Sequence, residues 1–226
     1  MMQRRRRRRV LAVGVGLALT ACSGGGNSTT PPSTASTRAV ESSTTGSSDS
    51  ATSNPPVTGD ELTRRLLVID DMPTGWSTVD LGNQPKRGLC NNPSITDSIP
   101  SNAEALAQFE RDPRNGPLFQ ERLVSFGSES DSAQVIEATR QQGESCTQWT
   151  DDQGTVSVGR LSLKVDGADE VIAFRLSITN PKGAKAVVDF VTARRGTIVA
   201  AFTYLGLSDD PEATATLAAK GILKLN

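Results

Sequence analysis

The chain contains no histidine, and its three cysteines are its most reactive side chains. Without histidine there is no Ser-His-Asp or Cys-His catalytic arrangement and no imidazole ligand for a metal. The sequence also has no CxxC motif and no glycine-rich phosphate loop behind a strand. A thiol can still be acylated, oxidised to a disulfide or used as a nucleophile with a base beside it. We therefore expect no enzyme activity, no cofactor and no metal site.

Pairs of adjacent carboxylates are the other groups with chemical potential. They are Asp70-Asp71, Asp151-Asp152, Asp169-Glu170 and Asp209-Asp210. Neighbouring residues in a strand point to opposite faces, so such pairs do not form a catalytic dyad. We expect them to act as helix caps and turn residues. A hydrolase with two carboxylates across a cleft, or calcium bound by loop carboxylates, is the alternative, and no EF-hand spacing supports calcium.

The first residues have the layout of a secretion signal. A basic block, Arg4 to Arg9, precedes an apolar run from Val10 to Leu19. As a helix this run would rise roughly 15 Å, about half of the hydrocarbon thickness of a bilayer, so it is too short for a permanent span. A basic head, a short apolar middle and small residues at the end are typical of a cleaved signal peptide.

Cys22 lies at the end of this signal. The residues Leu19-Thr20-Ala21-Cys22 resemble the bacterial lipobox, in which the cysteine receives a diacylglyceryl group and the signal is cut just before it. The resemblance implies a signal peptide over residues 1–21 and fatty acids such as palmitate on Cys22. It also implies anchoring to the cell membrane on its extracytoplasmic face, for which two or more acyl chains are needed. An ordinary cleaved signal or an arginine-rich nuclear or nucleic-acid tag is the alternative.

Cleavage before Cys22 changes the charge balance. The whole chain has 24 basic and 25 acidic side chains, and removal of the six arginines leaves 18 against 25, a net charge of −7. A net negative protein is a poor ligand for polyanions. We therefore expect no nucleic-acid partner, and contact with the membrane only through the anchor.

A polar segment separates the signal from the rest of the chain. Residues 22–59 consist mostly of Ser, Thr, Gly, Pro and Asn. They have too few apolar side chains to offset the entropy lost on ordering, so we predict a disordered tether. The remainder, residues 60–226, is long enough for one domain with its own core.

Cys90 and Cys146 remain once Cys22 is acylated. An even pair of cysteines in an oxidising compartment favours a disulfide, worth roughly 4 kcal/mol by chain-entropy reasoning. A catalytic thiol is the competing interpretation, and it lacks a histidine base.

Three further side chains are candidates for contact with a ligand. Trp76 and Trp149 each follow polar or turn residues, in PTGW and CTQW. An exposed tryptophan could stack on a sugar or cover a lipid, whereas the alternative is a ring that packs in the core and hydrogen-bonds its N–H. Arg175 is expected to face outward from an alternating strand, where it could meet an anionic ligand or lie on a solvated sheet face.

Apolar spacing predicts helices over Ser101–Glu110 and Ser130–Gly143, and a last helix capped by Asp210 with Pro211 in its first position. Glu61–Ile69 is expected to be a short helix or a turn-rich entry to the domain. The apolar stripe of the last helix consists of Leu217, Ala218, Ile222 and Leu225.

Strands are predicted over Leu118–Phe126, Thr155–Val165, Val171–Thr179, Ala186–Ala193 and Thr197–Tyr204. In the second of these the apolar parity changes near Gly159, as a β-bulge would make it do. The last two are joined by a short hairpin-like connection. The fold class is therefore α+β, with a curved antiparallel sheet packed against helices on one face.

Several segments taken together resemble a known family. They are LLVIDDMPTGW, ERLVSFGSESDSAQVIEATRQQGESCTQW, DEVIAFRLSI and VDFVTARRGTIVAAFTYLG, in this order and with Cys90 after the first. This is similar to the actinobacterial envelope lipoproteins with a PknH-like extracellular domain, related to the sensor domain of a membrane Ser/Thr kinase. The resemblance implies a disulfide-bearing α+β domain with a central cleft that binds an unidentified ligand.

The function that follows is that of an envelope binding or sensor-type lipoprotein. Its ligand would be a cell-wall fragment or a lipid, or its partner a neighbouring envelope protein. A structural or interaction protein without a small ligand, or a lipid carrier, is the alternative.

Overall fold

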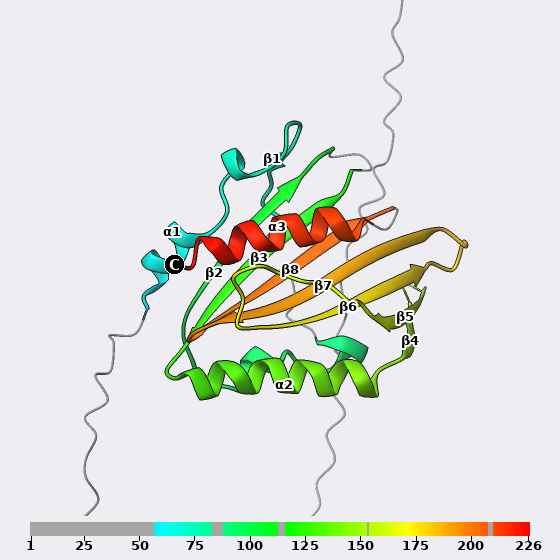
Figure 1. Ribbon diagram of the computed structural model, residues 1–226. Helices are drawn as coiled ribbons and strands as arrows, with labels where there is room; N and C mark the ends of the chain where they lie inside the picture. Colours follow the sequence, from blue (N-terminus) through cyan, green and yellow to red (C-terminus); the bar gives the residue numbers. More distant parts are fainter. Residues whose placement is uncertain (1–56, 83–87, 113–115, 153, 208–209) are drawn as a thin grey trace, which may run out of the picture. The chain divides into compact units, whose positions relative to one another are not determined.

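An eight-stranded antiparallel sheet forms the centre of the fold (Figure 1), in the order β1-β2-β3-β8-β7-β6-β5-β4. The computed structural model describes residues 57–82, 88–112, 116–152, 154–207 and 210–226, all within the unit Asn54–Asn226. The strands are β1 (Ser77–Thr78), β2 (Ser101–Glu110), β3 (Leu118–Phe126), β4 (Gln148–Asp151), β5 (Gly154–Arg160), β6 (Glu170–Thr179), β7 (Lys185–Arg195) and β8 (Ile198–Gly206).

The helices begin where polar side chains cap them. They are α1 (Gly59–Arg65), α2 (Glu129–Ser145) and α3 (Pro211–Leu223), with the short 3-10 turns η1 (Ile69–Asp71), η2 (Leu89–Asn91) and η3 (Ile95–Asp97). Thr58, Ser128 and Asp210 each accept a hydrogen bond from the backbone N–H three residues further on. None of the helices in the described ranges combines the length and hydrophobicity that a membrane crossing requires.

The predicted signal peptide and most of the predicted tether lie outside the described residues. The last residues of the predicted tether belong to the folded unit, because Val57 packs against the core and the Val57 carbonyl accepts a hydrogen bond from Ser125. Thr58 caps α1, and Gly59 is the first residue of that helix.

One predicted helix is wrong, since Ser101–Glu110 forms strand β2. Ala105 and Phe109 are buried on one face of the sheet, while Glu104, Leu106 and Gln108 alternate with them and face the other way. This alternation with a period of two outweighs the helical spacing of Ala103, Leu106 and Phe109.

The predicted bulge near Gly159 is also wrong. Strand β5 keeps an unbroken register with β6 up to Arg160 and ends there. Val158 packs on one side of the sheet, whereas Leu161 and Val165 belong to the core on the other side. The change of parity therefore marks the point where the chain leaves the sheet and passes to its other face.

The helices lie on both faces of the sheet (Figure 1). Leu62 of α1 and Leu217 of α3 share a core with Phe202 of β8. Ile136 of α2 packs instead with Phe174 of β6, whose side chain points the opposite way. The α+β class, the antiparallel sheet and the disulfide are confirmed, but the helices are divided between two faces where one had been expected.

Candidate functional site

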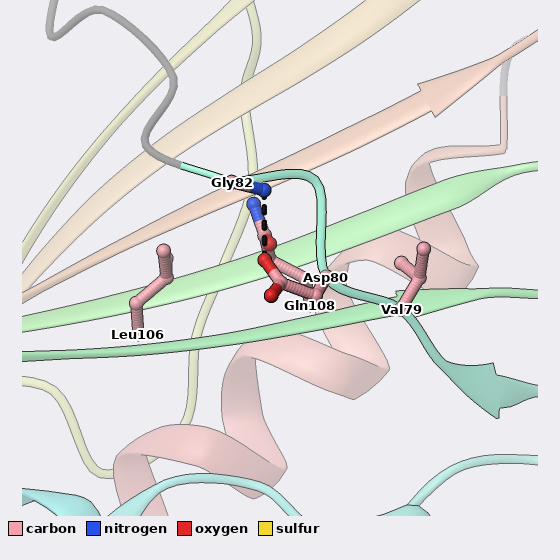
Figure 2. Close-up of a pocket in the computed structure, with 5 residues that line it drawn as sticks. All are labelled: Val79, Asp80, Gly82, Leu106 and Gln108. Atoms are coloured by element: carbon pink, nitrogen blue, oxygen red, sulfur yellow. Dashed lines mark hydrogen bonds between the residues drawn. The ribbon is translucent and has the colours of Figure 1, made fainter.

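A pocket opens beside β2, at the edge of the sheet. It has a volume of about 470 Å³ and is lined by Val79, Asp80, Gly82, Leu106 and Gln108. The first three belong to an arch of residues 79–82 that follows β1, and the other two lie on β2. Figure 2 shows Leu106 and Val79 on either side of the polar groups of Asp80, Gly82 and Gln108.

Hydrogen bonds hold the arch in place. The backbone N–H of Val79 donates to the carbonyl of Gln108 at 3.0 Å, which extends the pairing of β1 with β2. Gln108 Oε1 accepts from the N–H of Leu81 at 3.1 Å, and its Nε2 donates to Gln120 Oε1 at 3.2 Å. Asp80 Oδ1 accepts from the N–H of Gly82 at 2.8 Å. The buried Gln108 side chain therefore ties the arch to the sheet.

The pocket offers binding groups of several kinds. Asp80 contributes an exposed carboxylate, Gln108 a carboxamide, and Val79 and Leu106 aliphatic walls. The lining is more polar than apolar, which suits a hydrophilic ligand better than a purely apolar one. One carboxylate among these five lining residues does not provide the second acid that a two-carboxylate hydrolase uses.

The residues that the sequence suggested for ligand contact, Trp76, Trp149 and Arg175, are not among those that line this pocket. Trp76 is half-buried and packs against the main core, with its ring centroid 6.3 Å from that of Tyr204. Trp149, on β4, packs beside the disulfide and donates its ring N–H to Asp151 at 3.3 Å. Both rings pack against a core cluster as the packing interpretation describes, and Trp149 also makes the expected N–H hydrogen bond, while contact with a ligand stays a prediction.

Arg175 does not lie on a solvated sheet face as expected, because α3 covers that face. Its guanidinium forms a two-pronged ion pair with Asp189, with N–O distances of 2.7 and 2.9 Å. Asp189 is only 1 % exposed and accepts a third hydrogen bond from Thr214 of α3 at 3.0 Å. The charge of Arg175 is thus paired with the carboxylate that links β7 to α3, and its binding of an anionic ligand stays a prediction.

The predicted Cys90–Cys146 disulfide is confirmed, with the two Cα atoms 5.8 Å apart and a sequence separation of 56. It joins η2 to the end of α2. Cys22 lies outside the described residues.

Glu121 on β3, which no sequence motif marks, is a carboxyl buried at 0 % exposure. Desolvation by burial raises the pKa of Glu121 to about 7, although a hydrogen bond from the N–H of Leu67 opposes the shift. Its position could have been found, because Phe119, Glu121 and Leu123 occupy alternate positions of one apolar strand face.

Asp71, from one of the acidic pairs, has the turn role that was expected. It accepts hydrogen bonds from the N–H of Val68 at 2.8 Å and from Lys224 at 2.6 Å. The hydrogen bond from Lys224 is the main cause that lowers the pKa of Asp71. Across the described part of the chain, no three His, Cys, Asp or Glu side chains come together as metal ligands would.

The sequence matches no protein-family model, and no curated protein matches it significantly. The structure, in contrast, is similar to the crystal structure of the extracellular domain of PknH from Mycobacterium tuberculosis, with a TM-score of 0.59. The fold resembles that of the PknH extracellular domain. The match covers 76 % of this chain and 97 % of that domain at 12 % sequence identity, so it is a likeness of fold.

Proposed function

We propose that this chain is a lipid-anchored binding protein of the actinobacterial cell envelope, without catalytic activity, whose folded head takes up a ligand outside the cytoplasm. The observation that carries the proposal is the fold, since the match covers 97 % of the PknH extracellular domain. In a membrane kinase such a domain has the role of a sensor, and this head would have a comparable sensor-type role.

The sequence supplies the anchor for this proposal. The basic block, the apolar run and the four residues that end at Cys22 fit a lipoprotein signal. Acylation of Cys22 leaves Cys90 and Cys146, which are paired in the structure. Disulfides persist outside the cytoplasm, so the pair agrees with an exported head.

The pocket beside β2 is the proposed ligand site. Its carboxylate and carboxamide would bind hydroxyl or amide groups of a cell-wall fragment, while Val79 and Leu106 would cover an apolar part of it. A lipid tail would find few apolar contacts in so open a pocket, so a polar envelope fragment fits better than a lipid cargo.

Purification of the full chain from its native membranes tests the anchor and the ligand together. We expect an intact mass that shows an acylated N-terminal Cys22, and native mass spectrometry that shows a retained small molecule. Asp80→Asn keeps the oxygen that accepts from Gly82 but removes the charge, so we expect the retained fraction to fall about tenfold. The exposed Asp70→Asn is the matched control and should retain the ligand.

Each part of the result decides a different point. A full-length chain with an unmodified Cys22 would contradict the anchor. A lipidated chain that retains no small molecule but crosslinks to one discrete envelope protein would replace ligand binding with a structural or interaction role.

A further inference from the structure

The buried carboxyl of Glu121 connects parts of the chain that are far apart in sequence. Its Oε2 accepts a hydrogen bond from the N–H of Leu67 at 2.6 Å. Leu67 belongs to the linking segment, residues 66–72, which joins α1 to the rest of the fold and includes η1. Glu121 Oε1 has no hydrogen-bond partner among the described residues. A buried carboxyl with only one hydrogen-bonded oxygen lowers the stability of the folded state.

Helix α3 lies directly on this carboxyl. A Cβ placed on Gly221 would come within 2.7 Å of Glu121 Oε1 and 2.6 Å of the ring of Phe202. The helix can approach so closely only because position 221 has no side chain. One carboxyl is therefore enclosed by the linking segment, by β3 and β8, and by α3.

The charged groups around Glu121 belong to the linking segment and to the two helices. Asp71 of η1 pairs with Lys224 at the end of α3, and Lys220 donates to the carbonyl of Asp71 at 2.8 Å. Arg65 of α1 pairs with Glu61 and donates to the carbonyl of Leu225 at 3.2 Å. The cross-strand neighbours of Glu121 are apolar, namely Ala107 on β2 and Phe202 on β8.

We propose that Glu121 is a proton-operated latch, whose neutral form lets the linking segment and α3 close over the sheet and whose ionised form favours their opening. The neutral carboxyl still accepts the hydrogen bond of Leu67 and leaves no net charge under α3. The carboxylate is a charge enclosed by Phe202 and Gly221, and it gains hydration only if the linking segment or α3 moves away.

The sign and size of the effect follow from proton linkage. Burial raises the pKa of Glu121 from 4.5 to about 7 in the closed form. An opened form, in which the carboxyl meets water, returns toward the ordinary value, so opening releases a proton. The opening constant therefore rises with pH, by about tenfold between pH 6 and pH 8.

The latch lies where the chain passes from the predicted tether into the head. Val57, Thr58 and α1 precede the linking segment directly. Opening would thus loosen the part of the head nearest the anchor, together with α3, and leave the disulfide and α2 in place on the other face. The proposal is independent of the ligand site beside β2.

Hydrogen exchange of the full chain, read by mass spectrometry and corrected for the pH dependence of chemical exchange, tests the latch. Peptides that cover residues 66–72 and 217–225 should open about tenfold more at pH 8 than at pH 6. Glu121→Gln should remove this pH dependence. Glu104→Gln, on the opposite face of the neighbouring strand, should keep it.

A measurement on the wild-type chain covers the case in which Glu121→Gln does not fold. The side-chain carboxyl carbon of Glu121, followed by NMR with 13C-labelled glutamate, should titrate with a midpoint near 7. A midpoint below about 5, or equal pH dependence in wild type and Glu121→Gln, would overturn the latch.

Discussion

Single polar side chains in this fold connect elements that are far apart in sequence. The sequence of β6 alternates so cleanly that Arg175 looks like a surface residue, yet it pairs with the buried Asp189 on the adjacent strand, and Thr214 of α3 donates to the same carboxylate. No local pattern contains this information, because the three residues come together only when α3 lies on the sheet. The position of Glu121 could be predicted from its strand, whereas its contact with Leu67 could not.

Asp189→Ala tests the importance of the pair that holds α3. The substitution leaves the guanidinium of Arg175 without its carboxylate and removes the acceptor of Thr214 on α3. We expect the free energy of unfolding to fall by about 3–5 kcal/mol, as when one partner of a buried pair is removed. Urea unfolding measures this loss.

The exposed pair Lys164–Asp166 provides the comparison. Asp166→Ala should leave the urea midpoint almost unchanged, because exposed ion pairs contribute little. An equal shift in both variants would mean that Asp189 does not hold α3.

Whole elements were predictable where one signal dominated. The predicted cap at Asp210 and the first position of Pro211 are confirmed in α3, and α2 matches its predicted range to within two residues. Strand β2 was missed because its alanines fit both a helix and a strand, and only the pairing with β3 decides between them. The sequence of β8 does indicate that helices cover both faces of the sheet. Its residues from Ile198 to Phe202 are all apolar, so both faces of the strand are apolar there.

Gly143 determines how closely α2 approaches the sheet. A Cβ at this position would lie 1.9 Å from the ring of Phe174, so Gly143→Ala must displace the helix or the ring. We expect a loss of about 1–3 kcal/mol from overpacking, even though alanine is the better helix former. Thermal unfolding followed by circular dichroism measures the loss.

Gly59→Ala in α1 is the matched control, because nothing lies within 4 Å of the added Cβ. It should be neutral or slightly stabilising. A neutral Gly143→Ala would show that α2 packs less closely on Phe174 than the structure describes.

At the scale of the whole molecule, the fold likeness to the PknH extracellular domain survives at 12 % identity. The α+β class could be predicted from the sequence because apolar alternation is a local pattern. The disulfide could be predicted because two cysteines remain once Cys22 is set aside. The pocket beside β2 did not, since it is formed by an arch and a strand that are apart in sequence and that no motif marks. Cys22 and the leader stay predictions from sequence.

Cleavage of the disulfide tests how the head is held together. Cys90 and Cys146 connect the segment with η2 to the end of α2, and Leu89 is buried in the same cluster. The double variant Cys90→Ser, Cys146→Ser should lose about 4 kcal/mol in urea unfolding, because the unfolded chain is no longer cross-linked.

Addition of a reductant to the wild-type chain should give the same loss, and Cys22→Ser should give none. If the reduced wild-type chain unfolds at the same urea concentration as the oxidised one, the bond has no part in stability.

A sheet covered by helices on both sides has little interior left to vary. Most substitutions in the middle strands would disturb one core or the other. Residues that bind a ligand can therefore change without loss of stability only at the edge of the sheet. The arch of residues 79–82 lies there, attached to β2 by the backbone N–H of Val79 and by the buried amide side chain of Gln108. Proteins built on this scaffold should therefore differ most in that arch while their cores stay alike, and exchange of the arch between them is a direct route to new specificity.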